Sequence, residues 1–387
     1  MKALVVHVPY QVRGGEDVAV ESQKKALEAL GYEVSLWPND RTPPKLDPIR
    51  ILASLNGSDQ WKELENEFAR ERPKFAILNN IYPIYGPRLL RFLNQKKIPL
   101  FFAIHNHRLY CTNGLAMRDG SVCKLCKNSS PFRSVAFNCN QNYMRSIYYA
   151  TALSQIRRDR LLGSLQAFVA PSPYIGEEIK SLGIPMEKIH WIVNPVLDVS
   201  GGLDGSTSGA PGFDVFFGSR LSPEKGIKTF LTAIENLPQL KFAMAGDGEL
   251  KGAVLDAAQR LPNLTYLGVL SRSDVLARVK KCKITVLPSQ CNEALPTSVI
   301  EAFVCGKRCV IPDMESTRWL ADKPFPGVLA NTFDAVQLAS AILKAAEMSP
   351  IPTEQINEMK AFFGFDRYRI NLGNLIEKTL AKPSGLR

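Results

Sequence analysis

Apolar residues along this chain gather in short runs that alternate with longer amphipathic stretches. The run KALVVHV at residues 2–8 is nearly continuous and rich in β-branched residues, which is typical of a buried parallel strand. The stretch at residues 17–30 has helical spacing and stops at Gly31, a residue suited to a helix C-terminus. The same alternation predicts strands at 32–37, 75–79, 98–104, 166–172 and 189–193 and helices at 86–97 and 174–183.

Residues 200–212, SGGLDGSTSGAPG, show no periodicity and are the best candidate for a linker. The alternation then restarts, with strands predicted at 213–219, 241–246, 264–268, 283–288 and 308–312 and helices at 225–237, 249–261, 273–282 and 297–306. Strands that alternate with helices form a parallel sheet covered on both faces. The predicted fold class is therefore α/β, with two Rossmann-like doubly wound domains at residues 1–195 and 196–367 that face each other across a cleft.

Composition is that of a soluble globular protein, but the charge is unevenly distributed. Of 387 residues, 45% are hydrophobic and 22% are charged. The sequence has no apolar run long enough to span a membrane, and its first residues do not have the pattern of a signal peptide. We therefore expect a cytoplasmic protein. Residues 1–193 carry 26 Lys+Arg and 17 Asp+Glu, against 22 and 20 in the remainder. A basic first half favours an acidic partner such as anionic lipid, a phosphorylated acceptor or nucleic acid, and a merely solvated surface is the alternative.

Two basic segments with apolar residues at helical spacing, 88–97 and 145–162, have two interpretations. They could lie on an anionic membrane surface, or they could be ordinary amphipathic helices that pack on the sheet.

A loop rich in polar residues, GSRLSPEKG at 218–226, follows the first strand of the second domain. Arg220 and Lys225 lie on this loop and at the start of the next helix, where free N–H groups already favour anions. Two cations beside a helix N-terminus predict a diphosphate site, and a plain polar loop is the alternative. The turn Gly246-Asp247-Gly248 ends the next strand, and its small residues would let a ligand approach the backbone.

Carboxylates and a histidine follow other strands. Glu293 and Glu301, with seven residues between them, flank the start of a predicted helix, so both could accept hydrogen bonds from hydroxyls of one ligand. An ordinary helix start with acids near its positive end is the alternative. His105 follows the strand at 98–104 and could bind a sugar hydroxyl or handle a proton, unless it is a loop histidine bonded to backbone.

The glycine pair Gly14-Gly15 follows the first strand and resembles a phosphate-binding turn. It is not a G-x-G-x-x-G fingerprint, and the chain has no P-loop, H-E-x-x-H or strand-end D-x-D pattern. A metal-bridged diphosphate is therefore not favoured, and cationic side chains would have to replace the metal.

Four of the eight cysteines, Cys111, Cys123, Cys126 and Cys139, lie within thirty residues and include one C-x-x-C pair. Four thiolates are enough for a closed, structural zinc site. Unliganded or redox-labile thiols are the alternative.

These motifs together resemble the family 4 retaining glycosyltransferases of GT-B fold, the glycosyl transferases group 1. The family's G-x-L-x-x-E-K-G motif resembles Gly218 to Gly226, and its E-x7-E motif resembles Glu293 and Glu301. Its N-terminal glycine loop resembles Gly14-Gly15, and its strand-end histidine resembles His105. The chain departs from the family where Ala294 to Thr297 replace a Gly-Phe-Gly run.

The resemblance implies a role for each matching residue. Arg220 and Lys225 would hold the donor diphosphate, Glu293 and His105 would contact the transferred sugar, and Glu301 would bind the ribose. The remaining donor-binding positions would be Gly14, Gly15, Gly218, Gly246, Asp247 and Gly248.

The implied activity is transfer of a hexose-type sugar from a nucleotide-diphosphate sugar to a hydroxyl of a glycan or lipid-linked acceptor. This transfer would serve cell-surface polysaccharide or glycolipid synthesis in a bacterium, without a catalytic metal, on the inner face of the membrane. The resemblance also implies that a C-terminal helix at about 368–387 packs back on the first domain. The alternatives are a nucleotide-sugar epimerase of the same fold and a zinc-containing basic nucleic-acid-binding protein. The latter would leave the Arg/Lys and Glu/Glu pairs unexplained, so we expect no nucleic-acid partner.

Overall fold

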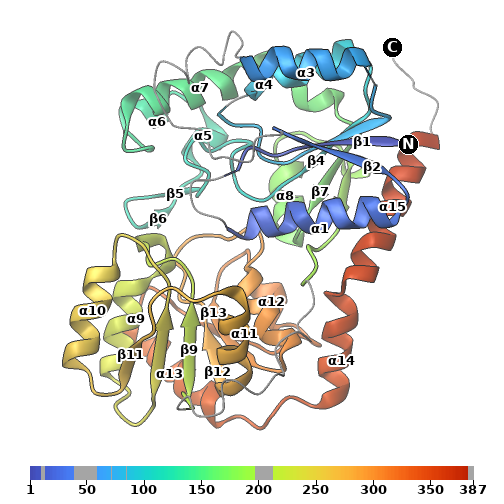
Figure 1. Cartoon of the computed structure of the whole chain (residues 1–387). Helices are drawn as coiled ribbons and strands as arrows, with labels where there is room; N and C mark the ends of the chain where they lie inside the picture. The colour runs from blue at the N-terminus through green and yellow to red at the C-terminus, as the bar shows by residue number, and fades with distance from the viewer. Residues whose placement is uncertain (10–13, 39–58, 71, 84, 197–211, 382–387) are drawn as a thin grey trace. The chain divides into compact units, whose positions relative to one another are not determined.

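The computed structural model describes residues 1–9, 14–38, 59–70, 72–83, 85–196 and 212–381 (Figure 1). Its internal contacts divide the chain into two compact units. Unit 1 comprises Met1–Ala116, Cys123–Pro195 and Phe365–Arg387, and unit 2 comprises Met117–Val122 and Val196–Gly364. The linker predicted at 200–212 lies outside the described residues except for Gly212.

Unit 1 is built on a parallel six-stranded sheet in the order β2-β1-β3-β4-β7-β8. The register places Ala3 of β1 between Val34 of β2 and Phe75 of β3. The central strands are apolar on both faces because helices cover both sides. The strands are β1 Lys2–Val6, β2 Glu33–Trp37, β3 Phe75–Leu78, β4 Leu100–Ala103, β7 Ala167–Ala170 and β8 Ile189–Trp191.

The main helices of unit 1 lie on the two faces of this sheet. Figure 1 shows α3, α4 and α7 on one face and α1 and α15 on the other. Side chains alternate along each strand, so Ala3 and Val5 point to the face where α1 and α15 pack. These helices and α8 are α1 Gly15–Ala29, α3 Asp59–Arg70, α4 Gly86–Gln95, α7 Tyr143–Arg158, α8 Pro173–Lys180 and α15 Phe365–Ala381.

The C-terminal helix α15 belongs to the core of unit 1. Tyr368, Leu372 and Ile376 are buried against β-strand residues and α1, and Gly373 lies against the Leu30 side chain. The segment from Phe365 onward thus contributes to the first unit.

The two basic segments fold as helices that bury apolar side chains. α4 buries Leu89, Leu90 and Leu93, and α7 buries Tyr148, Leu153 and Ile156. The interpretation as helices that pack within the domain is therefore correct for their apolar faces.

The segment between β4 and α7 has short elements that the sequence patterns did not predict. They are β5 Met117–Arg118, β6 Ser121–Val122, α5 Leu125–Asn128 and α6 Arg133–Ala136, and two 3₁₀ turns follow α7 and α8 at Leu161–Ser164 and Met186–Lys188. The two strands of this segment are half-buried or exposed, so they lack the continuous apolar run that marks the buried strands of the main sheets, and each short helix is a single turn without a repeat.

Unit 2 repeats the architecture with a parallel sheet in the order β11-β10-β9-β12-β13-β14. The strands are β9 Val215–Gly218, β10 Phe242–Ala245, β11 Leu264–Tyr266, β12 Ile284–Val286, β13 Arg308–Pro312 and β14 Gly327–Ala330. The helices are α9 Ile227–Glu235, α10 Lys251–Arg260, α11 Arg272–Lys281, α12 Thr297–Val304, α13 Ala335–Glu347 and α14 Thr353–Phe362, with 3₁₀ turns at Pro223–Lys225 and Arg318–Ala321. The sequence analysis did not assign β14, α13 and α14.

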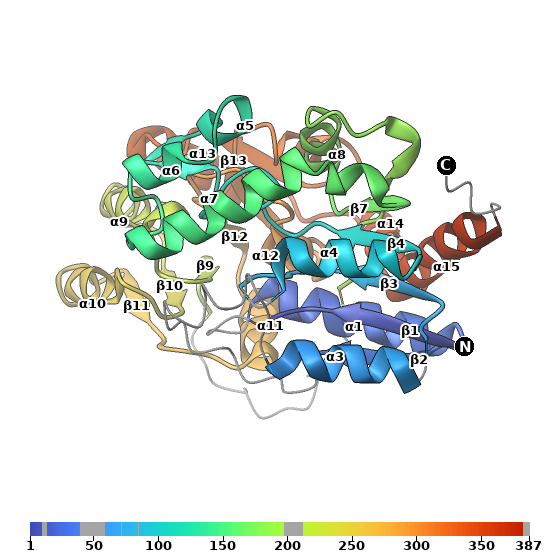
Figure 2. The same cartoon turned by 90° about the horizontal axis from the view of Figure 1, so that it is seen from above.

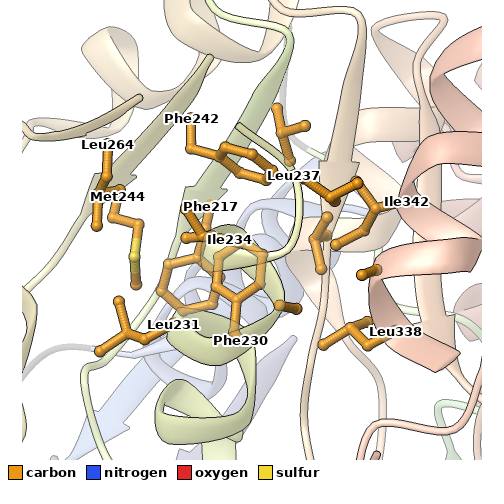
Figure 3. Packing of buried hydrophobic residues seen from close by; sticks show 14 of the residues in the cluster. Phe217, Phe230, Leu231, Ile234, Leu237, Phe242, Met244, Leu264, Leu338 and Ile342 are labelled. Carbon is orange, nitrogen blue, oxygen red and sulfur yellow. The ribbon is translucent and has the colours of Figure 1, made fainter. Parts of the chain in front are cut away.

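An aromatic core lies on one face of the unit 2 sheet. Figure 3 shows Phe217 and Phe242 from adjacent strands beside Phe230 of α9, with Leu338 and Ile342 of α13 on the other side of the cluster. These side chains are buried, and the period-2 alternation explains why Phe217 faces this cluster while its neighbour Phe216 does not. The core fixes the strand ends on which the candidate site is built.

No helix in the described part of the chain is both long and apolar enough to cross a bilayer.

Candidate active site

Three loops at the carboxyl ends of β9, β10 and β12 are joined to one another by backbone hydrogen bonds in unit 2. The Leu221 N–H donates to the Asp247 carbonyl at 2.8 Å, and the Gln290 N–H donates to the Glu224 carbonyl at 2.9 Å. The predicted diphosphate loop at 218–226 is therefore held from both sides by its neighbours.

Glycines make this close packing possible. Gly226 has φ 67°, and a Cβ there would lie 1.9 Å from the Pro288 carbonyl oxygen. Gly246 has φ 140°, and its Cβ would lie 1.9 Å from the Ser219 carbonyl oxygen. Any side chain at these positions would be both strained and overlapped. At Gly246 and Gly248 the backbones of the neighbouring loop leave no room for a Cβ, and the predicted approach of a ligand to this turn stays a prediction.

A buried ion pair joins two of these loops. Lys225 ends the 3₁₀ turn after β9, and Glu293 lies on the loop between β12 and α12. The Lys225 Nζ and Glu293 Oε1 atoms are 2.7 Å apart, and both side chains are largely buried. Ser289 donates a hydrogen bond to the same Glu293 oxygen, and the Glu293 N–H donates to Ser316 Oγ at 3.2 Å.

Each partner of this pair keeps the other charged. Burial alone raises the pKa of Glu293, but the Lys225 ammonium outweighs it and holds that pKa below its ordinary value. Burial alone lowers the pKa of Lys225, and the Glu293 carboxylate reverses this and raises it. A fixed cation and a fixed carboxylate therefore stand together at the sheet edge.

Arg220 adds a second cation to this group. Its side chain is 61% exposed and contacts Glu224, with Arg220 Nη2 and Glu224 Oε1 at 3.4 Å. Its positive charge acts on both Lys225 and Glu293. The structure thus brings together three of the four predicted catalytic residues in unit 2.

Glu301 forms a separate pair. It projects from α12 and binds Arg272, with the Arg272 Nη2 atom 3.1 Å from Glu301 Oε1. Burial raises the pKa of Glu301, and Arg272 offsets part of that rise. The sequence analysis gave the Arg272 side chain no role, although a cation at the start of α11 was visible in the pattern. Ser289 and Ser316, which contact Glu293, were also missed because single serines carry no motif.

His105 lies in unit 1, in a small pocket at the carboxyl ends of β3 and β4 that is also lined by Glu16, Asn79 and Asn106. His105 Nε2 is 2.8 Å from Asn79 Oδ1, which can only accept, so Nε2 carries the proton. Asn79 Nδ2 in turn donates to Gln23 Oε1 at 3.0 Å. Burial lowers the pKa of His105, which keeps the imidazole neutral at pH 7. The alternative, that His105 bonds to backbone, is wrong for its Nε2 atom, because Nε2 bonds to the side chain of Asn79.

Gly14 and Gly15 begin helix α1, directly after residues that the structure does not describe. The Gly14 N–H donates to Asp17 Oδ2 at 2.9 Å, and Asp17 Oδ1 is 2.9 Å from His7 Nε2. Among the residues that the structure describes, a Cβ at Gly14 would meet nothing within 4 Å. The predicted phosphate role of this turn stays a prediction.

The four clustered cysteines share one neighbourhood in unit 1. Cys111, Cys123 and Cys139 each act electrostatically on Cys126, and burial raises the pKa of the Cys126 thiol to about 11. No cysteine of the chain forms a disulfide. Among the described residues, no group of three or more His, Cys, Asp or Glu side chains is arranged to hold a metal ion. The zinc site therefore stays a prediction from the sequence.

Solved structures share the fold of this chain. Sucrose-phosphate synthase (tll1590) from Thermosynechococcus elongatus superposes with a TM-score of 0.72 at 14% identity, over 99% of this chain and 100% of that one. The chain has the GT-B fold. Residues 209–361 of this GT-B chain also match the family model described as glycosyl transferases group 1. The family match supports a glycosyltransferase, the structural likeness shows the fold, and the family match does not favour the epimerase or the nucleic-acid-binding protein.

Two curated relatives match parts of the chain. A Campylobacter jejuni enzyme, N,N'-diacetylbacillosaminyl-diphospho-undecaprenol alpha-1,3-N-acetylgalactosaminyltransferase, is 39% identical over 77 residues, 20% of either chain. An Escherichia coli enzyme, UDP-Gal:alpha-D-GlcNAc-diphosphoundecaprenol alpha-1,3-galactosyltransferase, is 29% identical over 136 residues, 33% of this chain and 35% of that one. The matched segments span between a fifth and about a third of these relatives.

Proposed function

We propose that this protein is a family 4 retaining glycosyltransferase that moves a hexose-type sugar from a nucleotide-diphosphate sugar to a hydroxyl of a lipid-linked or glycan acceptor. The observation that carries the proposal is the buried Lys225–Glu293 pair, with Arg220 beside it, at the strand ends of the unit that matches the family model.

The chemistry of these residues suits departure of a diphosphate. Negative charge grows on the diphosphate oxygen as the glycosidic bond breaks, and cations positioned for that charge bind the transition state more tightly than the ground state. Arg220 is exposed enough to reach the phosphates, while Lys225 is held in place by Glu293. We infer that these cations take the place of a catalytic metal, and that Glu301 and Arg272 meet the nucleoside.

The acceptor class is argued from the relatives. Both relatives named above act on a diphospho-undecaprenol sugar, and both form alpha-1,3 linkages. A retaining transfer from an alpha-linked donor gives such a product, which supports the retaining assignment and a lipid-linked acceptor for this chain.

A nucleotide panel tests the donor site. Thermal stability is measured with UDP, GDP, ADP, TDP and CMP, without added metal. A ligand at 100 times its dissociation constant adds roughly 2.7 kcal/mol, so one diphosphate nucleotide should raise the melting temperature visibly. Lys225→Ala should abolish the shift, and Arg220→Ala should lower sugar transfer about a hundredfold or more.

Lys228→Ala is the matched control, because Lys228 is exposed three residues further along the same loop and helix. It should leave both the shift and the transfer rate unchanged. Since Lys225→Ala leaves Glu293 buried without its cation, its folding is checked by circular dichroism, and the exposed Arg220 provides the second variant. Full transfer activity in Arg220→Ala, or no shift with any nucleotide, would contradict the proposal.

A further inference from the structure

Unit 1 exposes a group of large apolar side chains on two neighbouring helices. Phe132 and Phe137 flank α6 and are each 46% exposed, and Tyr143 at the start of α7 is 60% exposed. Met144 and Ile147, in the first turns of α7, are exposed as well. Figures 1 and 2 both show α6 beside α7, and the two helices are in contact. We define the α6–α7 surface as these five residues together with Arg133 and Arg145.

The rest of α7 is firmly anchored, so this exposure is not a sign of a loosely packed helix. Tyr148 is buried, and its hydroxyl donates to the Pro83 carbonyl at 2.6 Å. Arg157 donates to the carbonyls of Ser129 at 2.8 Å and Cys126 at 2.6 Å, which ties α7 to the segment before α6. A rigid helix therefore presents one apolar face to the core and, at its N-terminal end, a second apolar surface to solvent.

Basic residues lie in and around this surface. The 39 residues from Gly120 to Arg158 contain no Asp or Glu, and they hold six basic residues, Lys124, Lys127, Arg133, Arg145, Arg157 and Arg158. Lys124 and Lys127 pair with Glu178, and Arg158 pairs with Asp159, so the cations that belong to the α6–α7 surface itself are Arg133 and Arg145. Arg133 is exposed directly beside Phe132.

The combination fits a lipid surface better than other partners. Phenylalanine rings insert at the boundary between headgroups and acyl chains, the hydroxyl of tyrosine stays on the headgroup side, and arginines there bind lipid phosphates. Nucleic acid would use the arginines but would gain nothing from the exposed Met144 and Ile147. A second copy of the chain in a two-fold contact would set like-charged arginine groups against each other.

We propose that the α6–α7 surface docks this protein on an anionic bilayer, with Phe132, Phe137 and Tyr143 at the acyl-chain boundary and Arg133 and Arg145 on the phosphates. The proposal does not require the proposed transferase activity, because it rests on the exposure and charge of unit 1 alone.

Vesicle sedimentation tests the proposal on the full chain without substrate. We expect binding to vesicles of phosphatidylcholine with 30% phosphatidylglycerol and little binding to pure phosphatidylcholine. A basic residue near an anionic surface contributes about 1 kcal/mol, so Arg133→Gln with Arg145→Gln should weaken binding about thirtyfold. Phe137→Ser, Tyr143→Ser and Ile147→Ser combined should lower binding at least as much. In Phe137→Trp, brominated acyl chains should quench fluorescence beyond the wild-type level.

Matched controls remove equally exposed groups elsewhere. Leu255→Ser, Val336→Ser and Ile370→Ser combined, and Arg260→Gln with Arg369→Gln, should leave binding unchanged. Circular dichroism and melting temperature show whether each variant is folded. The proposal is wrong if the wild-type protein does not bind anionic vesicles. It is also wrong if the α6–α7 variants and the control variants lose binding equally. It is wrong as well if this surface binds a protein or a nucleic acid and does not bind lipid.

Discussion

At the residue scale, the candidate site consists of charges that the fold places in opposed pairs. Lys225 pairs with Glu293 and Glu301 pairs with Arg272, each across two different loops or helices. The sequence analysis identified three of these four residues by type and spacing. It could not identify the pairing, because Lys225 and Glu293 are 68 positions apart. The partner of a charge is set by which strands are neighbours in the sheet.

His105 provides a prediction at this scale. Its Nε2 proton is directed to Asn79, and burial lowers its pKa, so the midpoint of its NMR titration should lie below the ordinary value of about 6.5. Asn79→Asp places a carboxylate against the ring, which stabilises the imidazolium and should raise the pKa of His105 by about one to three units. The acidic limb of the pH–rate profile should move to higher pH by a similar amount.

Long-range ¹H–¹⁵N NMR spectra report both the tautomer and the titration of His105. Asn94→Asp is the control, since Asn94 lies on α4 and bonds to Ser164 instead. An unchanged His105 titration in Asn79→Asp would show that Asn79 does not set the protonation of this ring.

At the scale of elements, the site depends on loops that interlock at the ends of β9, β10 and β12. The sequence patterns predicted each of these strands to within three residues, because buried parallel strands are short apolar runs bounded by turn residues. From the sequence, the glycines of the turn at 246–248 were expected to let a ligand approach, and the structure adds a packing reason. A motif shows that glycine is present, whereas only the packed loops show that a neighbouring carbonyl needs its space.

Glycine substitutions test this element-scale argument. Gly226→Ala and Gly246→Ala each bring a Cβ to within 1.9 Å of a backbone carbonyl oxygen, so the loops must separate. Each variant should lose more than about 1 kcal/mol of unfolding free energy, measured by urea denaturation, and nucleotide-dependent stabilisation should weaken with it.

Gly252→Ala is the matched control in helix α10. A Cβ at Gly252 meets nothing within 4 Å, and alanine favours a helix by up to about 1 kcal/mol, so this variant should be as stable as the wild type or more stable. Wild-type stability in Gly226→Ala and Gly246→Ala would mean that the loops do not interlock as described.

At the scale of the whole molecule, the chain leaves unit 1 and returns to it. Residues Phe365–Arg387 belong to unit 1, although unit 2 separates them from the rest of it in the sequence. Helix α15 completes the same apolar face that α1 covers, and Leu372 is fully buried there. Unit 1 therefore depends on a segment that follows unit 2 in the sequence.

Leu372→Ala measures this dependence. Truncation of a buried leucine costs about 2–5 kcal/mol, and the loss should be confined to the unit that contains the cavity. Hydrogen exchange should accelerate in β1 and β3 of unit 1 and stay unchanged in β9 and β12 of unit 2. Ile370→Ala, at a position that is 49% exposed on the same helix, should change stability by less than about 0.5 kcal/mol. Equal acceleration in both units would contradict a core role for α15 in unit 1 alone.

The sequence by itself determined the α/β class and most strands and helices, because those features follow from local periodicity. It also identified Arg220, Lys225, Glu293, Glu301 and His105 as candidate residues, since strand-end positions in parallel sheets collect polar side chains. Only the tertiary structure decided the ion-pair partners, the backbone packing around Gly226 and Gly246, and the tautomer of His105. Each of these depends on contacts between segments far apart in the chain, and local patterns carry no information about which distant segments meet.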